Sequence, residues 1–396
     1  MTPPLRGTRI ISVEQYGAGP FGSSYLADMG AEVIKIETPG LGDSSRRSGP
    51  HFLGENDSHF FQTFNRSKRS FSLNLKHPDG RRILRELAAT ADAVMNNLRG
   101  DQPARLGLTY RDLRETKPNL VCLHLSGYGR EGPRAAWPAY DYLLQAEAGF
   151  MSLTGEPDGP PTRMGLSIID YLSGITAAFA LTAAMLGAAR SGQGRDVDVT
   201  LYDVAMHQLT YPAAWYLNAG DETPRRPRSG HPSVVPCEMI PTADGQIFVM
   251  CVLPKFWDAL CRIADVPELL DDDRFETPAA RHANREALME ILDKAFARST
   301  TADWIDRLAG CVPVAPVLTM AQALENPYAR ETGAIETIDH DAAPDGLSFV
   351  ASPIRLDGQR PKSRAAPQLG ADTEQVLSSL GYEDHDIAAL RDKGVI

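Results

Sequence analysis

The chain has 396 residues, with 40 Lys and Arg against 51 Asp and Glu, and its formal net charge is −11. This length exceeds that of a usual single domain, so we expect two domains and a large core. The net negative charge argues against nucleic acid or an acidic membrane as the main partner, because neither attracts a polyanion.

The cysteines indicate a reducing compartment. Five are present, they are scattered, and none is spaced as C-x-x-C: Cys122, Cys237, Cys251, Cys261 and Cys311. A disulfide scaffold or a zinc site is therefore not expected. The first residues also lack the apolar core of a signal peptide, and we expect a cytoplasmic protein.

One uncharged stretch, 171–189, is long enough to suggest a membrane span. Its many Ala, Gly, Ser and Thr residues instead favour a tightly packed central helix, and we expect no membrane association.

The first half of the chain alternates strands and helices. Strands are predicted at 9–13, 31–37, 69–75, 92–98, 119–129 and 195–201, with helices at 22–30, 78–91, 109–118, 171–189 and 202–220. Such alternation predicts an α/β fold with a parallel sheet covered on both faces. Active sites in these sheets lie beyond the carboxyl ends of the strands.

The second half begins at a segment rich in Pro and Arg. We predict a large domain at 1–210, a linker at 211–227, a small α+β domain at 228–320, and a linker and return to the large domain at 321–396. The small domain contains a hairpin at 237–253 and helices at 254–266 and 284–298. The tail from Asn326 is predicted to be loop-like before two short helices at 372–396.

The turn after the first strand reads "GAGPFG", Gly17 to Gly22, and the acid Glu37 follows. The pattern G-x-G-x-x-G with a later acid is the dinucleotide-binding fingerprint. The alternative is an ordinary strand-to-helix turn that favours glycine, with Glu37 as a surface acid.

Seven longer motifs follow one another along nearly the whole chain. They are "GAGPFGSSYLADMGAEVIKIETPGLGDSSR", "FNRSKRSFSLNLKHPDGR", "RLGLTYRDL", "LSGYGREGP", "AYDYLLQAEAGFMSLTG", "VDVTLYDVA" and "LGADTEQVLSSLGYEDHDIAALRDKGVI". In these motifs and their order, the chain resembles the class III CoA-transferases, which include formyl-CoA transferase and the carnitine CoA-transferases.

The resemblance implies a Rossmann-like parallel sheet in a large domain built from N- and C-terminal parts, a smaller α+β domain, and an interlocked homodimer. It also implies that the turn at Gly17 contacts coenzyme A instead of a dinucleotide. Coenzyme A and its acyl thioesters would be substrates, with no permanently bound cofactor.

The family's nucleophile is an Asp shortly before a small-residue helix, and "RMGLSIIDYLSG" matches it at Asp170. In that family the carboxylate attacks an acyl-CoA to give an anhydride and then an aspartyl-CoA thioester. From the residues alone, a plain helix N-cap is the favoured interpretation of Asp170, and the resemblance reverses that order.

The resemblance also assigns coenzyme A contacts, with two departures from the family pattern. The matching positions are Gly17, Ala18, Leu73, Lys76, Asn97, Leu98, Arg105, Leu106 and Tyr140. Leu98 replaces a Phe, and Tyr140 replaces a His that racemases of the same fold use. Leu253 replaces their Glu, so an α-methylacyl-CoA racemase is the weaker alternative.

The motifs "PPTRMGLSIID" and "RSGHPSVVP" most resemble the branch that uses succinyl-CoA or other dicarboxyl-CoA donors. Arg163 or Arg228 would then hold the distal carboxylate, and His231 would line the pocket. An exposed loop Arg and a hydrogen-bonding loop His are the alternatives. A dinucleotide-dependent oxidoreductase and a non-catalytic transferase subunit are further alternatives from other classes.

Overall fold

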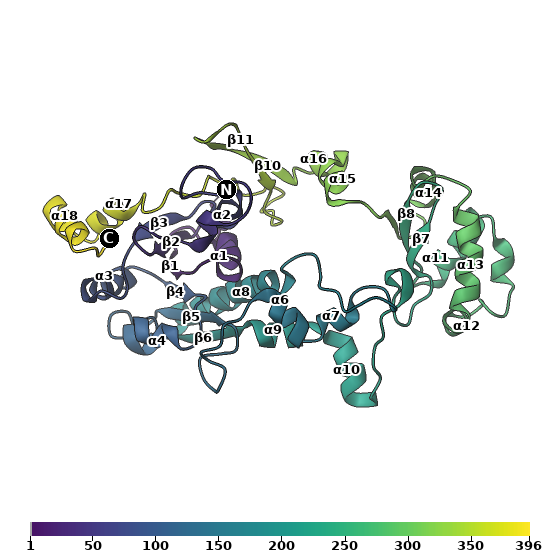
Figure 1. The fold of residues 1–396 in the computed structure, drawn as a ribbon, viewed down its shortest axis with the longest axis horizontal. Coiled ribbons are helices and arrows are strands. Elements are labelled where there is room, and N and C mark those ends of the chain that lie inside the picture. The colour runs from purple at the N-terminus through teal and green to yellow at the C-terminus, as the bar shows by residue number, and fades with distance from the viewer. Residues whose placement is uncertain (1) are drawn as a thin grey trace. The chain divides into compact units, whose positions relative to one another are not determined.

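The computed structural model describes residues 2–396, which form two compact units (Figure 1). The first unit contains the chain up to Ala148, Gly165–Gln208 and Arg330–Ile396. The second contains Gly149–Met164 and Leu209–Ala329. The chain therefore enters the second unit twice, and this unit includes the segment 211–227 that the sequence analysis treats as a linker.

The first unit is built on a six-stranded parallel sheet in the order β3-β2-β1-β4-β5-β6. The strands are β1 (Arg9–Val13), β2 (Glu32–Glu37), β3 (Arg69–Ser72), β4 (Ala93–Asn96), β5 (Val121–Ser126) and β6 (Arg195–Thr200). This is the order of a doubly wound sheet, whose ligands bind where the order reverses, between β1 and β4. The predicted mixed α/β fold is confirmed.

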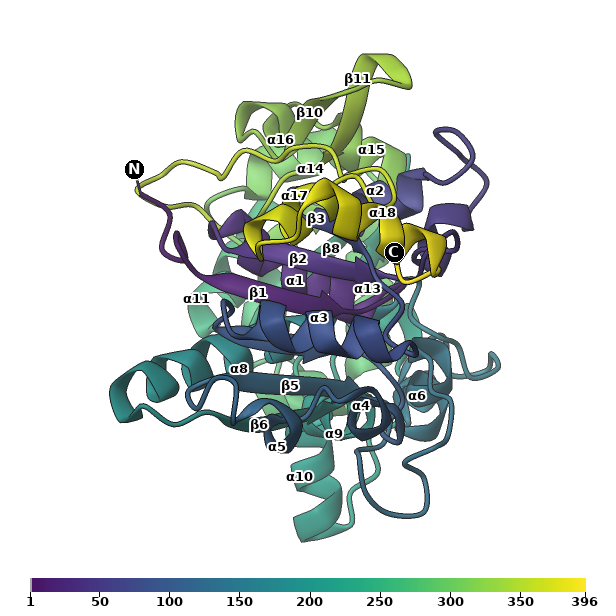
Figure 2. The ribbon, with the colours of Figure 1, turned by 90° about the vertical axis from the view of Figure 1, so that its left-hand side faces the viewer.

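One face of the sheet is covered by segments from both ends of the chain. Helix α3 (Pro78–Ala88) packs there with α17 (Thr373–Ser379) and α18 (Asp384–Asp392) in a single apolar core (Figure 2). Buried Leu87 and Leu377 belong to this core. The C-terminal helices are thus part of the first unit.

Helices α1 (Ala18–Asp28) and α8 (Ile168–Ser191) cross each other at glycines. A Cβ atom placed on Gly22 would lie 2.4 Å from the backbone oxygen of Gly174, so neither position has room for a side chain. This close approach brings the first turns of the two helices together.

Helix α8 is less buried than the sequence predicts. It is long and apolar enough to cross a membrane by length and composition, and 33% of its most apolar 18-residue window is buried. Ile175, Phe179 and Leu186 are 42%, 74% and 54% exposed. Their spacing places them on one face of the helix. The expected tight packing is found on the face toward α1 and the sheet, and the opposite face is exposed in the single chain.

The second unit combines a three-stranded antiparallel sheet with helices. Strands β7 (Cys237–Pro241), β8 (Gln246–Met250) and β9 (Val314–Pro316) pair in that order. Helices α11 (Pro254–Ile263), α12 (Pro278–Ala283), α13 (Arg285–Phe296) and α14 (Thr301–Leu308) accompany them. Trp257 and Trp304 are among the buried side chains of this unit's core.

Two predicted elements differ in the structure. The helix expected at 202–220 is divided into α9 (Leu201–Gln208) and α10 (Thr210–Ala219), because Thr210 adopts a φ of 44°. The tail expected to be loop-like contains α16 (Pro327–Glu331) and a hairpin of β10 (Ile335–His340) and β11 (Ala343–Val350). These strands are mostly polar and half-exposed, so they lack the apolar run that marks a strand.

Candidate active site

Asp170 lies in the first turn of α8, three residues after the N-cap residue Ser167. The free backbone N–H groups at the N-terminus of α8 donate to a different residue. Asp141, the first residue of α6 (Asp141–Glu147), accepts from the backbone nitrogens of Ile169 and Asp170 at 2.6 and 3.0 Å. Gln145 Nε2 donates to the other oxygen of Asp141 at 2.6 Å. The interpretation of Asp170 as a plain N-cap is therefore wrong.

The carboxylate of Asp170 is left without a partner. Within residues 2–396, no side-chain or backbone donor forms a hydrogen bond to it. Burial, together with the negative charge of Asp141, raises the pKa of Asp170 to about 7. Both effects disfavour the ionised form, so this carboxylate is more basic than an ordinary aspartate.

The three glycines of the opening motif are explained by close contacts. A Cβ on Gly17 would lie 2.5 Å from Asp170 Oδ2, and one on Gly19 would lie 2.8 Å from Asn97 Cγ. Gly22 faces Gly174 in the helix crossing. These contacts account for the glycine spacing without a bound pyrophosphate, and they bring the turn against Asp170.

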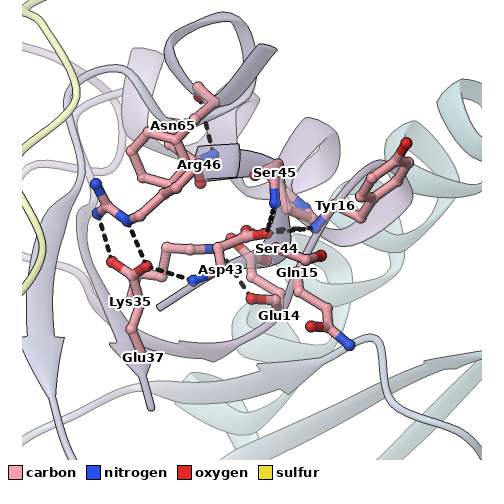
Figure 3. Close-up of polar contacts among 12 residues, drawn as sticks. Glu14, Gln15, Tyr16, Lys35, Glu37, Asp43, Ser44, Ser45, Arg46 and Asn65 are labelled. Atoms are coloured by element: carbon pink, nitrogen blue, oxygen red, sulfur yellow. Dashed lines mark hydrogen bonds and ion pairs between the residues drawn. The ribbon is translucent and has the colours of Figure 1, made fainter. Parts of the chain in front are cut away.

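Glu37, the acid of the apparent fingerprint, is buried and ion-paired (Figure 3). Its two carboxylate oxygens accept from Arg46 Nε and Nη2 at 2.8 and 2.7 Å. Ser70 Oγ donates to Glu37 Oε1 at 2.7 Å. Glu37 is therefore neither a surface acid nor available to a ribose, which removes the second feature of the dinucleotide interpretation.

A second buried ion pair supports the backbone just before Gly17. Tyr16 adopts a φ of 70°, and its backbone N–H donates to Asp43 Oδ1 at 3.0 Å. Asp43 is paired with Lys35, whose Nζ lies 2.8 Å from Asp43 Oδ2 (Figure 3). Burial would raise the pKa of Asp43, but the Lys35 charge holds it below its usual value. The left-handed conformation at Tyr16 is strained for a side-chain-bearing residue, and this buried acceptor helps to hold it.

Two cavities meet at Asp170. One, the Asp170 cleft, has a volume of about 650 Å³ and lies at the carboxyl ends of β1, β4 and β5. The other, the aromatic cavity, has a volume of about 310 Å³ and is walled by aromatic side chains. Its aromatic residues are Tyr16, Phe60, Phe64, Tyr140, Tyr142 and Tyr171. Gly17 and Asp170 line both, so the carboxylate is reachable from either side.

A third cavity, the Lys76 cleft, extends from the same region and has a volume of about 560 Å³. Of the predicted coenzyme A residues, Gly17, Ala18, Asn97, Leu98 and Tyr140 line the Asp170 cleft, while Leu73, Lys76, Leu98 and Leu106 line the Lys76 cleft. Leu98 therefore contributes to both cavities.

Two predicted residues have other partners. Arg105 lines neither cleft; it is exposed and its Nη1 lies 3.3 Å from Asp101 Oδ2. Asn97 lines the Asp170 cleft, but its amide exchanges two hydrogen bonds with the backbone of Gln15, at 2.9 and 2.7 Å. Asn97 therefore ties the ends of β1 and β4 together.

Some cleft residues were missed by the sequence analysis. Arg99 lines the Asp170 cleft, and Gln15 and Gln102 line both the Asp170 cleft and the Lys76 cleft. Their position just after the predicted ends of the strands could have indicated them, because residues there lie at the edge of the sheet where ligands bind. Asp141, which holds the first turn of α8, was also missed.

The three predicted substrate residues lie in the second unit, and each makes local contacts. Arg228 donates to both oxygens of Asp293, at 2.6 and 2.7 Å. Arg163 donates to the backbone oxygen of Met164 at 2.8 Å. His231 Nδ1 accepts from the backbone nitrogens of Ser233 and Val234. The guanidinium of Arg228 is thus already occupied by a carboxylate of the protein.

The sequence is similar to known proteins over nearly its whole length. The model of CoA-transferase family III matches residues 5–373. A succinate–glutarate CoA-transferase of Agrobacterium fabrum is 36% identical over 96% of both chains. A succinyl-CoA:glutarate CoA-transferase of Homo sapiens is 33% identical over 99% of this chain and 90% of the human one.

Solved structures give the same result. A CAIB/BAIF family protein of Brucella suis is 31% identical and superposes with a TM-score of 0.83, covering 96% of this chain and 100% of that one. Together with the family model and the relatives, this likeness shows that the chain belongs to CoA-transferase family III.

Proposed function

We propose that this CoA-transferase moves coenzyme A between carboxylic acids by covalent catalysis at Asp170. The observation that carries the proposal is the Asp170 carboxylate itself, which has no hydrogen-bond partner within residues 2–396 and lies where the Asp170 cleft meets the aromatic cavity. A carboxylate that neither caps its helix nor forms an ion pair is free to act as a nucleophile.

The donor is proposed to be succinyl-CoA or another dicarboxyl-CoA. Support comes from the names of the similar proteins, a succinate–glutarate and a succinyl-CoA:glutarate CoA-transferase. A succinyl-CoA:mesaconate CoA-transferase of Haloarcula marismortui is also 31% identical over 96% of this chain. The acceptor is accordingly proposed to be a dicarboxylic acid.

The reaction proceeds through four acyl exchanges at three carbonyl carbons: those of the donor, of Asp170 and of the acceptor. Asp170 attacks the donor thioester, and the C–S bond breaks to give a mixed anhydride and free CoA thiolate. The thiolate then attacks the Asp170 carbonyl, releasing the donor acid and forming an aspartyl-CoA thioester. The acceptor carboxylate attacks that thioester to give a second anhydride, and the thiolate finally takes the acceptor acyl group and frees Asp170.

Each exchange passes through an intermediate with a negatively charged oxygen. The backbone N–H groups of the glycine turn are proposed to donate hydrogen bonds to that oxygen. Within the described chain, the backbone N–H groups of Gly17 and Ala18 have no acceptor. They belong to the N-terminal end of α1, where the helix dipole favours negative charge. Both residues line the Asp170 cleft.

Coenzyme A is proposed to extend from the Asp170 cleft into the Lys76 cleft. The two cavities share Gln15, Leu98 and Gln102, so one elongated ligand is able to occupy both. Lys76 supplies positive charge for its phosphates, whereas Arg99 lines the Asp170 cleft with its guanidinium paired to Asp101 at 3.1 and 3.2 Å. The thiol end then lies toward Asp170.

The working molecule is proposed to be an interlocked homodimer in the cytoplasm. The exposed apolar face of α8, formed by Ile175, Phe179 and Leu186, supports a covering partner, because soluble proteins seldom leave such faces open to water. A second copy of the chain is proposed as that partner, in line with what the family resemblance implies.

A direct experiment compares the wild type with Asp170→Asn. Acyl-CoA donors are incubated with carboxylic acids, starting with succinyl-CoA and glutarate, and new CoA esters are scored by mass spectrometry. The wild type should transfer CoA, and hydroxylamine added during turnover should label Asp170. Asp170→Asn should be folded and inactive. Normal turnover by this variant would contradict covalent catalysis at Asp170.

A racemase is distinguished in the same assay. In deuterated water, a racemase exchanges the α-hydrogen of an acyl-CoA, whereas CoA transfer alone does not. We expect no exchange, because Tyr140 stands at the position of the racemase His.

A further inference from the structure

The second unit contains a cavity that has no part in the site described above. It has a volume of about 370 Å³ and lies among the end of α10, the segment 221–226, residues 232–233 and α12. Trp215, Pro224 and Pro232 form apolar parts of its wall, and Thr223, Arg226 and Ser233 contribute polar groups. All of these residues belong to the second unit.

Two residues of this wall each have a polar atom that is buried and has no hydrogen-bond partner. These atoms are Arg226 Nε and Thr223 Oγ1. A buried donor that loses water and gains no hydrogen bond is destabilising, and a charged donor more so. Such a group in a folded protein calls for a partner that completes it, such as a ligand.

Arg226 is unlike its neighbours. Arg225 donates to the backbone oxygen of Pro160 at 2.9 Å, and Arg228 forms two bonds to Asp293. Arg285 is paired with Glu238, with Nη2 3.1 Å from Oε1. Within residues 2–396, Arg226 has no ion-pair partner. In that part of the chain its side chain therefore has neither an ion pair nor a hydrogen bond, whereas Arg225 is bonded to a backbone oxygen and Arg228 and Arg285 are paired with acids.

We propose that this cavity binds the carboxylate of a small organic acid through Arg226 and Thr223. A guanidinium presents paired donors that match the two oxygens of a carboxylate, and the Thr223 hydroxyl adds a third donor. The apolar wall suits a short hydrocarbon chain. That the acid is dicarboxylic rests on the proposed function, whereas the binding site itself does not.

This assignment changes which Arg is expected to recognise an acid. Arg228, one of the two arginines that the family resemblance suggests, already has a carboxylate partner in Asp293. Asp221 also lines the cavity and is the acid that competes with a ligand for Arg226. Removing Asp221 should therefore preserve or strengthen binding.

The test follows the Nε–H resonances of ¹⁵N-arginine in the intact protein. The Arg226 signal is assigned as the one missing from the spectrum of Arg226→Gln. Added glutarate should shift this signal in the wild type and in Asp221→Asn, whereas dimethyl glutarate, which carries no charge, should not. Arg225→Gln is the matched control, in which the Arg226 signal still responds.

Thermal unfolding without ligand gives an independent readout. Because Arg226 has no partner to lose, Arg226→Gln should melt at or above the wild-type temperature. A lower melting temperature, a changed oligomeric state, or an Arg226 signal unmoved by glutarate overturns the proposal. Asp170→Asn should abolish transfer and keep the glutarate-induced shift, so failure of the catalytic mechanism is recognised separately.

Discussion

At the start of α8, two different acids cap the helix and carry the proposed reaction. Asp141 reaches across from α6 to accept the free N–H groups of α8, and Asp170 keeps its carboxylate for chemistry. The arrangement has an electrostatic cost, since two acids lie close together. Because the charge of Asp141 disfavours a second negative charge, it raises the pKa of Asp170, and the more basic carboxylate is the stronger nucleophile.

The first prediction concerns Asp141→Asn. The amide oxygen can still accept from the α8 backbone, but the negative charge is removed. The pKa of Asp170, now about 7, should fall. The acidic limb of the kcat/KM–pH profile should then move to lower pH by roughly one unit, with the remainder of the upward shift kept by burial.

The control for this prediction is Glu147→Gln, which removes an acid at the exposed end of the same helix, α6. Its pH profile should match that of the wild type. An unchanged limb in Asp141→Asn would show that the charge of Asp141 does not act on Asp170.

The second prediction links the same group to stability. A carboxyl whose folded pKa lies above its unfolded pKa favours the folded state at low pH, and this contribution is lost as pH rises through about 7. Asp170→Asn removes the ionisation. Its melting temperature should therefore exceed that of the wild type by more at pH 8 than at pH 5, as measured by calorimetry. An equal difference at the two pH values would contradict the raised pKa.

At the scale of elements, the carboxyl end of β1 is supported by buried charge. Lys35 on β2 pairs with Asp43, which accepts the N–H of Tyr16, and Arg46 pairs with Glu37. These contacts join β2 and the turn after it to the strained residue that precedes Gly17. The position of the glycine turn thus depends on residues well outside the two clefts.

The third prediction is that Lys35→Met destabilises the fold by about 3–5 kcal/mol, because it leaves Asp43 buried without its ion-pair partner. Chemical denaturation measures the loss. Where the variant still folds, transfer should also slow, since Tyr16 and Gly17 are less firmly held. Lys393→Met, at an exposed lysine, should change stability by less than about 0.5 kcal/mol.

The elements themselves were predictable to different degrees. The central strands of the large sheet were readable as continuous apolar runs, as in "AVM" of β4, and β6 was readable from its alternation of polar and apolar residues. Strands β10 and β11 were not, since Ile338 and Leu347 are their buried apolar residues and the rest are largely polar or half-exposed. A strand is recognised in a sequence when one of its faces is buried and apolar, and this hairpin buries few apolar residues.

The candidate site was predictable only in part. Asp170 was found through the family resemblance, and the glycine turn through its spacing. The role of Asp141 was hidden because its contacts join residues 28 and 29 positions apart, which no local pattern records. The same holds for Glu37, whose partner Arg46 lies on the turn η1 (Ser44–Arg47) beyond β2.

At the scale of the whole molecule, the open face of α8 is the main feature that a single chain does not account for. Phe179 is 74% exposed and lies at the centre of this face. A membrane and a second protein chain both cover such a surface. We propose that a second copy of the chain covers this face, and the oligomeric state in solution distinguishes this arrangement from a membrane contact.

The fourth prediction is that the wild type is a stable dimer without detergent, with a native mass near twice the 43.1 kDa of one chain. Phe179→Asp should shift the protein toward monomer in analytical ultracentrifugation, because it introduces a charge into the covered surface. Leu41→Asp, at another exposed apolar position, should remain dimeric. A monomeric wild type, or one that requires detergent, would refute the dimer.

The glycine crossing of α1 and α8 also limits how new substrate preferences can arise. Any side chain at Gly22 or Gly174 pushes apart the two helices that carry the glycine turn and Asp170, so substitutions there damage the site before they enlarge it. Phe60 and Phe64 lie on α2 (His59–Asn65), line the aromatic cavity and pack against the rings of Tyr16, Phe21 and Tyr171, without taking part in the glycine crossing. Laboratory evolution toward bulkier acyl groups should therefore accumulate changes at Phe60 and Phe64 and leave the crossing intact.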